Sequence, residues 1–147
     1  MNDNGDDAAA VAREQLARLE HEMAAPPFHA VLRPEAITVE PDGSVVIRLP
    51  FNPALRGARD ADFYHGGVIA SLVDLAAHAA VAVRVGHRVP TIDLRVDYLR
   101  ALGGVDLVAT GRVVGAGRSI GRADVEIKAG ETVIALGRAV FSTVKHS

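Results

Sequence analysis

The stretch that decides the fold spans residues 65–86 and reads HGGVIASLVDLAAHAAVAVRVG. It lacks the apolar–polar alternation of a strand, and apolar side chains cover most of the circumference it would have as a helix. The polar side chains before its last turn are Ser71, Asp74 and His78. At roughly 100° per residue these three fall within an arc of about 60°. The stretch therefore predicts a buried helix that carries one narrow polar stripe.

The segments on either side of this helix have strand periodicity, apart from one more helix near the N-terminus. Apolar residues at three- and four-residue spacing predict that helix over 8–24, after a frayed start over 1–7, and Pro26-Pro27 ends it. A hairpin follows over 37–51 with its turn at Pro41-Asp42-Gly43, and 52–64 reads as a polar loop. Four strands are expected after the helix, at 91–100, 105–114, 119–128 and 132–144. The links between these strands are short, which predicts antiparallel neighbours and an α+β fold with one sheet against one apolar helix.

Composition narrows the class of protein. The chain has 147 residues, 49% of them hydrophobic, which suits one domain. Its 16 Lys+Arg against 18 Asp+Glu give a net charge of −2, without the basic footprint of a nucleic-acid binder. There is no cysteine, so disulfides, thiolate nucleophiles and Cys-ligated zinc are excluded. No uninterrupted apolar run reaches the ~20 residues of a membrane span, and the polar MNDNGDD start is unlike a signal peptide. We therefore expect a cytoplasmic protein that binds neither nucleic acid nor membrane.

The polar stripe has two readings. It is the solvent-exposed side of the helix, or it lines a cleft or subunit interface where a half-buried carboxylate acts as a base or nucleophile. Asp74 is the strongest candidate for that role. His78 lies one turn further on and could reach Asp74 at i, i+4 spacing, although a histidine among alanines is more often structural.

The start of the helix is a second candidate site. Gly66 and Gly67 follow His65 and lack Cβ atoms, so a ligand could approach the unsatisfied N–H groups of the first turn. The helix dipole favours negative charge there, and such N–H groups can hold an oxyanion. Two glycines are equally consistent with a tight turn alone.

Three segments carry a resemblance to a known family. HGGVIASLVD, TIDLRVDYLRA and GRSIGRADVEI resemble the hotdog-fold acyl-CoA thioesterases of the phenylacetate-degradation (PaaI-like) type. The resemblance covers about residues 35–145. It implies a hotdog thioesterase domain over 35–147, preceded by an N-terminal helical extension over 1–34.

The resemblance implies an architecture and a mechanism. A curved antiparallel sheet wraps the central helix, and subunits pair as a homodimer or a dimer of dimers (homotetramer) to build the sites between them. The N–H of Gly66 would bind the thioester carbonyl, with His65 beside it. Asp74 of the partner subunit would act as general base or nucleophile, and Thr91 would lie near the attacking water.

The resemblance also implies contacts with an acyl-CoA substrate, of which coenzyme A is a part; no separate cofactor or metal is expected. Candidate CoA- and substrate-binding residues are Gly67, His78, Arg59, Arg118 and Ser119. The family commonly has an asparagine six residues before the HGG histidine, where this chain has Arg59. Asp60 or Asp62 could take its place instead, whereas Asn52 lies too far upstream to be matched.

Two other functions remain open from the sequence. A hotdog enoyl-CoA hydratase or dehydratase would use His65 or His78 together with Asp74. A non-catalytic acyl-CoA-binding module would bind acyl-CoA without hydrolysing it. The thioesterase reading rests on the family resemblance, since one fold can serve several functions.

Overall fold

Helix α3 (Gly66–Val85) forms the centre of the fold, as its apolar sequence predicts. The computed structural model describes residues 3–145, and ten of the 20 residues of α3 are buried in it. Gly86 ends the helix in the left-handed conformation (φ 80°). Among the described helices, α3 is the one long and apolar enough to cross a membrane (mean hydropathy 1.8), and 56% of that stretch is buried inside the protein. Its apolar surface is therefore core.

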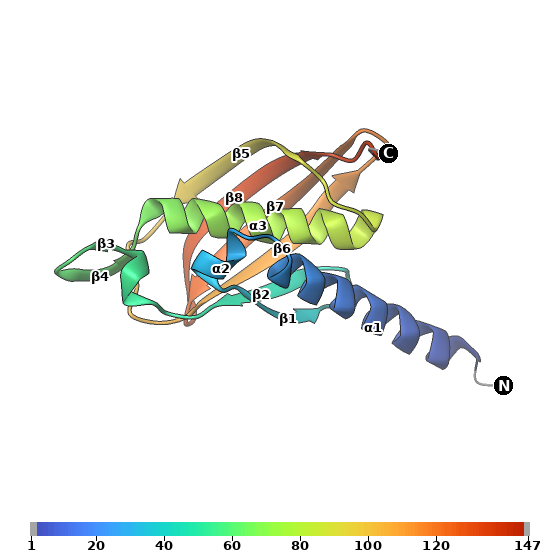
Figure 1. Ribbon diagram of the computed structural model, residues 1–147, viewed down its shortest axis with the longest axis horizontal. Helices are drawn as coiled ribbons and strands as arrows, with labels where there is room; N and C mark the ends of the chain where they lie inside the picture. Colours follow the sequence, from blue (N-terminus) through green and yellow to red (C-terminus); the bar gives the residue numbers. More distant parts are fainter. Residues whose placement is uncertain (1–2, 146–147) are drawn as a thin grey trace.

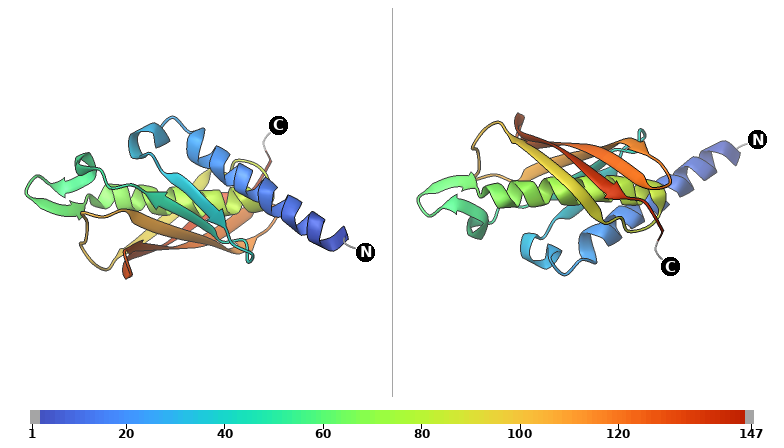
Figure 2. Two further views of the ribbon diagram at one scale, coloured as in Figure 1. Left: turned by 90° about the horizontal axis from the view of Figure 1, so that it is seen from below. Right: turned by 90° about the horizontal axis from the view of Figure 1, so that it is seen from above.

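A six-stranded antiparallel sheet packs against α3. Its strands, in the spatial order β1-β2-β6-β7-β8-β5, are β1 (Glu35–Val39), β2 (Val45–Leu49), β6 (Leu107–Ala116), β7 (Ile120–Ala129), β8 (Thr132–Ser142) and β5 (Thr91–Tyr98). Figure 1 shows the strands running behind α3, and α1 (Asp3–Ala24) crosses α3 obliquely and packs against both α3 and the edge strand β1 (Figure 2). The α+β prediction is confirmed.

The position of β5 differs from the prediction that consecutive strands are neighbours. The β6–β7 and β7–β8 pairs form as expected, but β5 pairs with β8 at the far edge of the sheet. The connection from β5 to β6 spans residues 99–106 and is longer than a tight hairpin turn. Because that connection crosses the end of the sheet, β5 becomes an edge strand that runs alongside α3, with Thr91 beside Asp74 and Tyr98 beside Gly66 at the helix start.

The segment 52–64, predicted as a loop, contains structure. A short η1 (Pro53–Leu55) leads into a hairpin formed by β3 (Arg56–Ala58) and β4 (Ala61–Tyr64), which projects from one end of the molecule (Figure 1). The loop prediction is wrong because the hairpin depends on distant contacts. One of these is a β-bridge between Phe63 and Gly103, which periodicity within the segment cannot reveal.

The N-terminal region also differs in detail. α1 begins at Asp3 rather than at residue 8, so most of the frayed start predicted over 1–7 is helical; residues 1 and 2 lie outside the described residues. A short α2 (His29–Leu32) replaces the extended chain predicted after the two prolines. α1 buries Leu19 and Met23 in the main core, and the division of the chain at residue 34 stays a prediction.

Glycines let α3 approach the sheet closely, and Gly111 on β6 gives a test of this packing. An added Cβ there would lie 2.5 Å from the backbone oxygen of Ala76 on α3. We expect Gly111→Ala to lower the free energy of unfolding by about 1–3 kcal/mol, because a backbone atom cannot yield as a side chain can. Gly115→Ala on the same strand is the matched control, because its Cβ would meet nothing within 4 Å. Equal denaturant midpoints for the two variants would contradict this packing.

Candidate active site

The N-terminus of α3 presents a free N–H group. His65 is the N-cap residue, and its Nδ1 accepts a hydrogen bond from the N–H of Gly67 at 2.9 Å. The N–H of Gly66 has no hydrogen-bond partner within residues 3–145. It also lies at the positive end of the helix dipole. Of the two glycines, Gly66 is therefore the one available to hold an oxyanion, while Gly67 is occupied by the cap.

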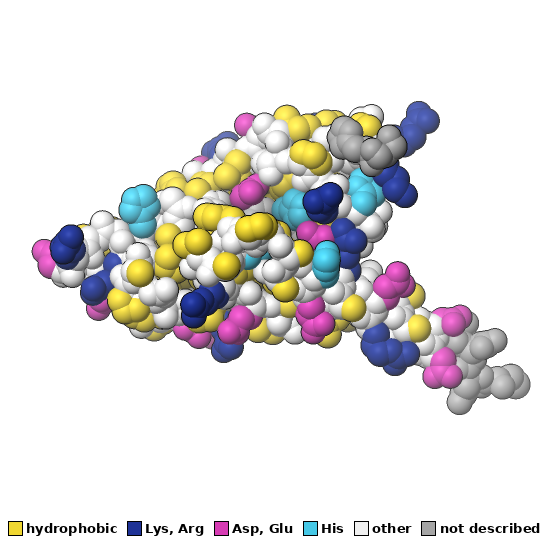
Figure 3. Space-filling view, viewed as in Figure 1, with side chains coloured by type: hydrophobic (Ala, Val, Ile, Leu, Met, Phe, Trp, Pro, Cys, Tyr) yellow, Lys and Arg dark blue, Asp and Glu magenta, His cyan; other side chains and the backbone are white. Residues whose placement is uncertain are grey.

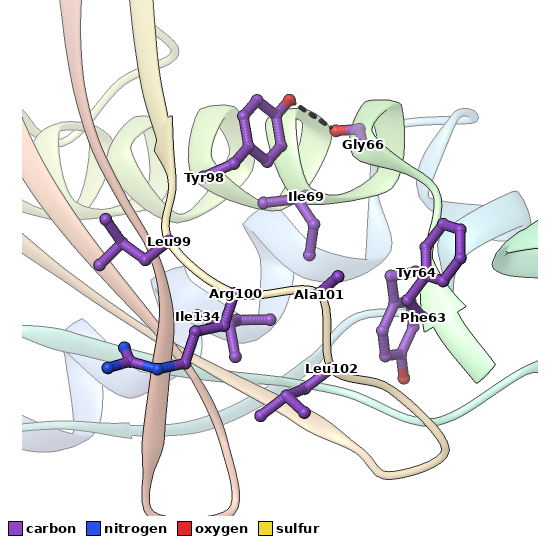
Figure 4. A pocket seen from close by; sticks show the side chains of 10 residues that line it. All are labelled: Phe63, Tyr64, Gly66, Ile69, Tyr98, Leu99, Arg100, Ala101, Leu102 and Ile134. Carbon is purple, nitrogen blue, oxygen red and sulfur yellow. Dashed lines mark hydrogen bonds between the residues drawn. The ribbon is translucent and has the colours of Figure 1, made fainter. Parts of the chain in front are cut away.

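Two side chains hold this first turn in place. The hydroxyl of Tyr98, at the end of β5, donates to the backbone oxygen of Gly66 at 2.8 Å (Figure 4). The hydroxyl of Ser71 donates to the oxygen of Gly67, also at 2.8 Å. Tyr98 is not among the candidate site residues that the sequence predicts. Its position beside Gly66 follows from β5 lying at the sheet edge, which the strand pattern does not specify.

Asp74 lies two turns further along α3 and is half-buried. Its Oδ1 accepts a hydrogen bond at 2.9 Å from the hydroxyl of Thr91, the first residue of β5. The structure thus brings together two of the predicted catalytic residues. The bond fixes the carboxylate while leaving lone pairs on it for a water molecule.

Gly66 and Asp74 of one chain are too far apart to act on the same atom. They are eight residues apart on a continuous helix, which corresponds to about 12 Å along its axis. A thioester carbonyl whose oxygen contacts Gly66 is therefore out of reach of the carboxylate in the same chain.

His78 faces α1 and is bonded to neither Asp74 nor Thr91. Its Nδ1 lies 3.5 Å from Oε2 of Glu22, a buried α1 carboxylate that also pairs with Arg18 at 2.7 Å. The N–H of Val89 points to its Nε2 at 3.5 Å. The i, i+4 partnership with Asp74 is thus absent from the hydrogen bonds among the described residues, and His78 instead ties α3 to α1. Figure 3 shows histidine, acidic and basic side chains gathered where these helices meet.

The burial of His78 gives a pH dependence with a definite sign. Burial lowers its pKa below the ordinary value of 6.5, against the opposing effect of Glu22 and Asp74. The unfolded chain therefore binds the proton more readily, and stability falls as the pH drops below about 6.5. We expect a plot of Tm against pH between neutrality and mild acid to flatten in His78→Gln. The exposed His21→Gln on α1 is the control and should keep the wild-type slope; equal slopes for all three proteins would contradict this role of His78.

The other predicted contact residues lie at opposite ends of the molecule. Arg59 is exposed at the tip of the β3–β4 hairpin. Arg118 and Ser119 are exposed in the β6–β7 turn, where the N–H of Thr143 donates to the oxygen of Ser119 at 2.9 Å. The structure does not bring either place together with Gly66 and Asp74 in one chain. No three His, Asp or Glu side chains among residues 3–145 are grouped so as to hold a metal ion.

The β3–β4 hairpin changes the reading of Asn52. The N–H of Leu55 donates to the oxygen of Asn52, and the N–H of His65 donates to the oxygen of Leu55, both at 2.9 Å. The hairpin segment 56–64 therefore leaves the body of the fold after Leu55 and returns to it at His65, beside Leu55. Asn52 therefore lies two hydrogen bonds from His65 despite its distance in sequence. The Asn52-Pro53 pair is the sequence signal for this position. The hairpin residues between it and His65 make the two appear distant in the sequence.

A cavity of about 350 Å³ opens beside Gly66. Its walls come from β4, the first turn of α3, the end of β5 with the following loop, and β8; they are formed by Phe63, Tyr64, Gly66, Ile69, Tyr98, Leu99, Arg100, Ala101, Leu102 and Ile134 (Figure 4). Burial raises the pKa of Tyr64 to about 12, so this phenol stays neutral. Most of the lining is apolar, which suits a hydrocarbon group.

Comparison with known proteins identifies the family. A sequence profile described as "Thioesterase superfamily" matches residues 62–135. A Halobacterium salinarum protein provisionally assigned as an esterase is 35% identical over 77% of this chain and 83% of its own length. The medium/long-chain acyl-CoA thioesterase YigI of Salmonella typhimurium is 33% identical over 82% of this chain and 88% of its own. The chain belongs to the thioesterase superfamily.

Solved structures give the same fold. A thioesterase-superfamily protein with 30% identity superposes with a TM-score of 0.82, covering 87% of this chain and 97% of the other. The E. coli PaaI protein from the phenylacetic acid degradation operon has a TM-score of 0.80 at 21% identity, covering 93% and 98%. The resemblance to PaaI-like hotdog proteins and the predicted hotdog fold are confirmed.

Proposed function

We propose that this protein is an acyl-CoA thioesterase that hydrolyses a small or medium acyl- or aryl-CoA to the free acid and CoA. One observation carries the proposal: α3 combines a free N–H at Gly66 with a half-buried carboxylate, Asp74, held by Thr91. An oxyanion donor and a positioned carboxylate are the groups that ester hydrolysis requires. The related YigI is named as an acyl-CoA thioesterase, which supports the same reaction.

The two groups act from different subunits of a homodimer or dimer of dimers. About 12 Å of helix separates them within a chain, so an isologous pair of chains would give two identical sites. In each, Gly66 of one copy faces Asp74 of the other. The exposed edge strand β5 carries both Thr91 and Tyr98, so a second copy against this edge would complete both half-sites.

The reaction proceeds by attack of water on the thioester carbon. Asp74 takes a proton from the water, the new C–O bond forms, and the negative charge moves to the carbonyl oxygen at the N–H of Gly66. Collapse of this intermediate breaks the C–S bond, and CoA leaves as a thiolate that takes up a proton. Direct attack by Asp74 through an anhydride uses the same groups. Neither route needs a metal or a separate cofactor.

The acid–base pair of a hydratase has no support in these contacts. The Nδ1 of His65 is used by the helix cap, and His78 is turned to Glu22. For CoA, we assign the nucleotide and pantetheine end to Arg118 and Ser119. His78 adds a second candidate surface, because it borders a cavity of about 450 Å³ that also includes Arg88 and Lys145.

Asn52, rather than Arg59, is our choice for the polar residue that orients substrate or water. It lies at the base of the hairpin near His65, whereas Arg59 projects at the tip. The Oδ1 of Asn52 caps η1 by accepting from the N–H of Ala54 at 2.9 Å, and its amide N–H₂ group, which has no partner among residues 3–145, is able to donate.

The test is a panel of CoA thioesters assayed by release of free thiol, with enoyl-CoA hydration followed in parallel. Hydrolysis of saturated acyl-CoA supports the proposal. Binding of CoA esters without turnover identifies a binding module, and hydration of enoyl-CoA identifies a hydratase. Either of those results contradicts it.

A further inference from the structure

The polar side chains in the wall of the 350 Å³ cavity each donate a hydrogen bond to a backbone oxygen of the protein itself. The hydroxyl of Tyr64 donates to the oxygen of Val105 at 2.7 Å, and that of Tyr98 to the oxygen of Gly66. The guanidinium of Arg100 donates to the oxygen of Val133 at 3.0 Å and points away from the cavity in Figure 4. The wall therefore offers a ligand few hydrogen bonds from its side chains. An occupant gains mainly by burying hydrocarbon.

The N–H of Gly66 is a donor at the cavity that has no hydrogen-bond partner among residues 3–145. A ligand that fits has an acceptor oxygen joined directly to an apolar group. The acyl group of a thioester has this pattern. Phe63, Leu99 and Leu102 in the wall are 37%, 47% and 42% exposed, so a chain lying there would cover apolar surface that is now open to water.

The β3–β4 hairpin fixes the position of Phe63. Gly57 leaves room for the ring, because a Cβ there would lie 2.2 Å from a ring carbon of Phe63. Gly103 receives the hairpin backbone, because its Cβ would lie 1.5 Å from the oxygen of Asp62. Phe63 also forms a β-bridge with Gly103. These close contacts hold the aromatic ring in the cavity wall.

We propose that this cavity receives the acyl chain of the substrate and that Phe63, presented by the hairpin, sets the chain length accepted. The proposal rests on the thioesterase function proposed above. The volume of about 350 Å³ corresponds to roughly ten groups of about 30 Å³, the volume per water molecule, which is close to that of a methylene. The substrate class is thus a medium-length aliphatic acyl-CoA, or an aryl-CoA of similar bulk.

The test measures kcat/KM for straight-chain acyl-CoA thioesters from butanoyl- to palmitoyl-CoA. Phe63→Ala removes part of the wall and so makes room for a longer chain. The ratio of kcat/KM for palmitoyl- over octanoyl-CoA should rise about tenfold, which is the effect expected when the pocket accommodates one or two more methylene groups. Leu102→Phe narrows the same cavity and should shift the preference to shorter chains. Phe28→Ala is the matched control, because Phe28 is 55% exposed and lies just before α2, away from the cavity wall.

Failure of this inference is distinguishable from failure of the proposed function. A wild-type protein that hydrolyses acyl-CoA, with the same chain-length profile in Phe63→Ala and Leu102→Phe, overturns the acyl pocket and keeps the thioesterase. A wild-type protein inactive on every member overturns both. Light scattering is measured on each variant: dissociation of the oligomer in Phe63→Ala with an unchanged profile would show that a second copy covers the cavity, and this also overturns the proposal.

Discussion

Asp74→Asn is expected to lower kcat by about 10²–10⁴-fold, the usual cost of removing a catalytic base. The asparagine side chain has nearly the same shape, and its oxygen can still accept the hydrogen bond from Thr91, so the fold and the geometry of the pair persist. What is lost is the ability to take a proton or to attack as an anion. KM should change far less than kcat, because the carboxylate acts on the reacting atoms rather than on the bulk of the CoA.

The control for this variant is Glu131→Gln, which removes one carboxylate at an exposed position in the β7–β8 turn. It should match the wild type in rate and in Tm. Both variants are assayed by thiol release with the best substrate of the panel. A folded Asp74→Asn protein with the wild-type kcat would remove Asp74 from the mechanism.

Gly66→Pro is expected to lower kcat by about 10²–10³-fold through the loss of a single donor. Proline has no N–H, and the first position of a helix is where it fits best. His65 before it already has ψ 137°, in the extended region that a following proline requires. Gly66 is the first residue of an α-helix and its φ is not positive, so its backbone conformation is compatible with proline. The substitution thus removes the proposed oxyanion donor while the helix start persists.

Gly66→Ala separates loss of the N–H from added bulk. A Cβ at this position would lie 3.6 Å from Tyr98, an ordinary van der Waals contact, and the N–H remains. Alanine should therefore keep kcat within a few-fold of the wild type, while proline does not. Equal losses in the two variants, at equal circular dichroism and Tm, would show that space rather than the N–H matters at this position.

The central helix was the most predictable part of the fold because its signal is local. An apolar stretch without alternation, started by His65-Gly66-Gly67 and ended by Gly86, specifies a buried helix from its own residues. The β1–β2 turn was equally local: Gly43 has φ 84°, and the Asp42 carboxylate accepts from the N–H of Ser44. The β3–β4 hairpin and the pairing of β5 with β8 depend on contacts between distant segments, so periodicity could not supply them.

The candidate site likewise contains residues that local sequence signals predict and residues whose role depends on contacts between distant segments. Gly66 and Asp74 were found because one helix carries both, and its polar stripe is visible in a single segment. Tyr98 could not be predicted, because the role of its hydroxyl depends on which backbone atom lies beside it in the fold. That atom is the oxygen of Gly66. Asn52 was set aside because the hairpin separates it from His65 in sequence but not in space. Among the described residues His78 forms no hydrogen bond with Asp74, because the carboxylate beside it is Glu22, on a different helix.

Complementation between two inactive variants tests the central claim most directly. Asp74→Asn and Gly66→Pro chains are co-expressed with different tags, and the mixed oligomer is isolated and assayed for thioester hydrolysis. If each site takes Gly66 from one copy and Asp74 from the other, a mixed dimer has one site with both native groups and recovers about half of the wild-type activity per dimer. Mixed dimers as inactive as either parent would show that the two groups do not meet across subunits, and the account would be wrong.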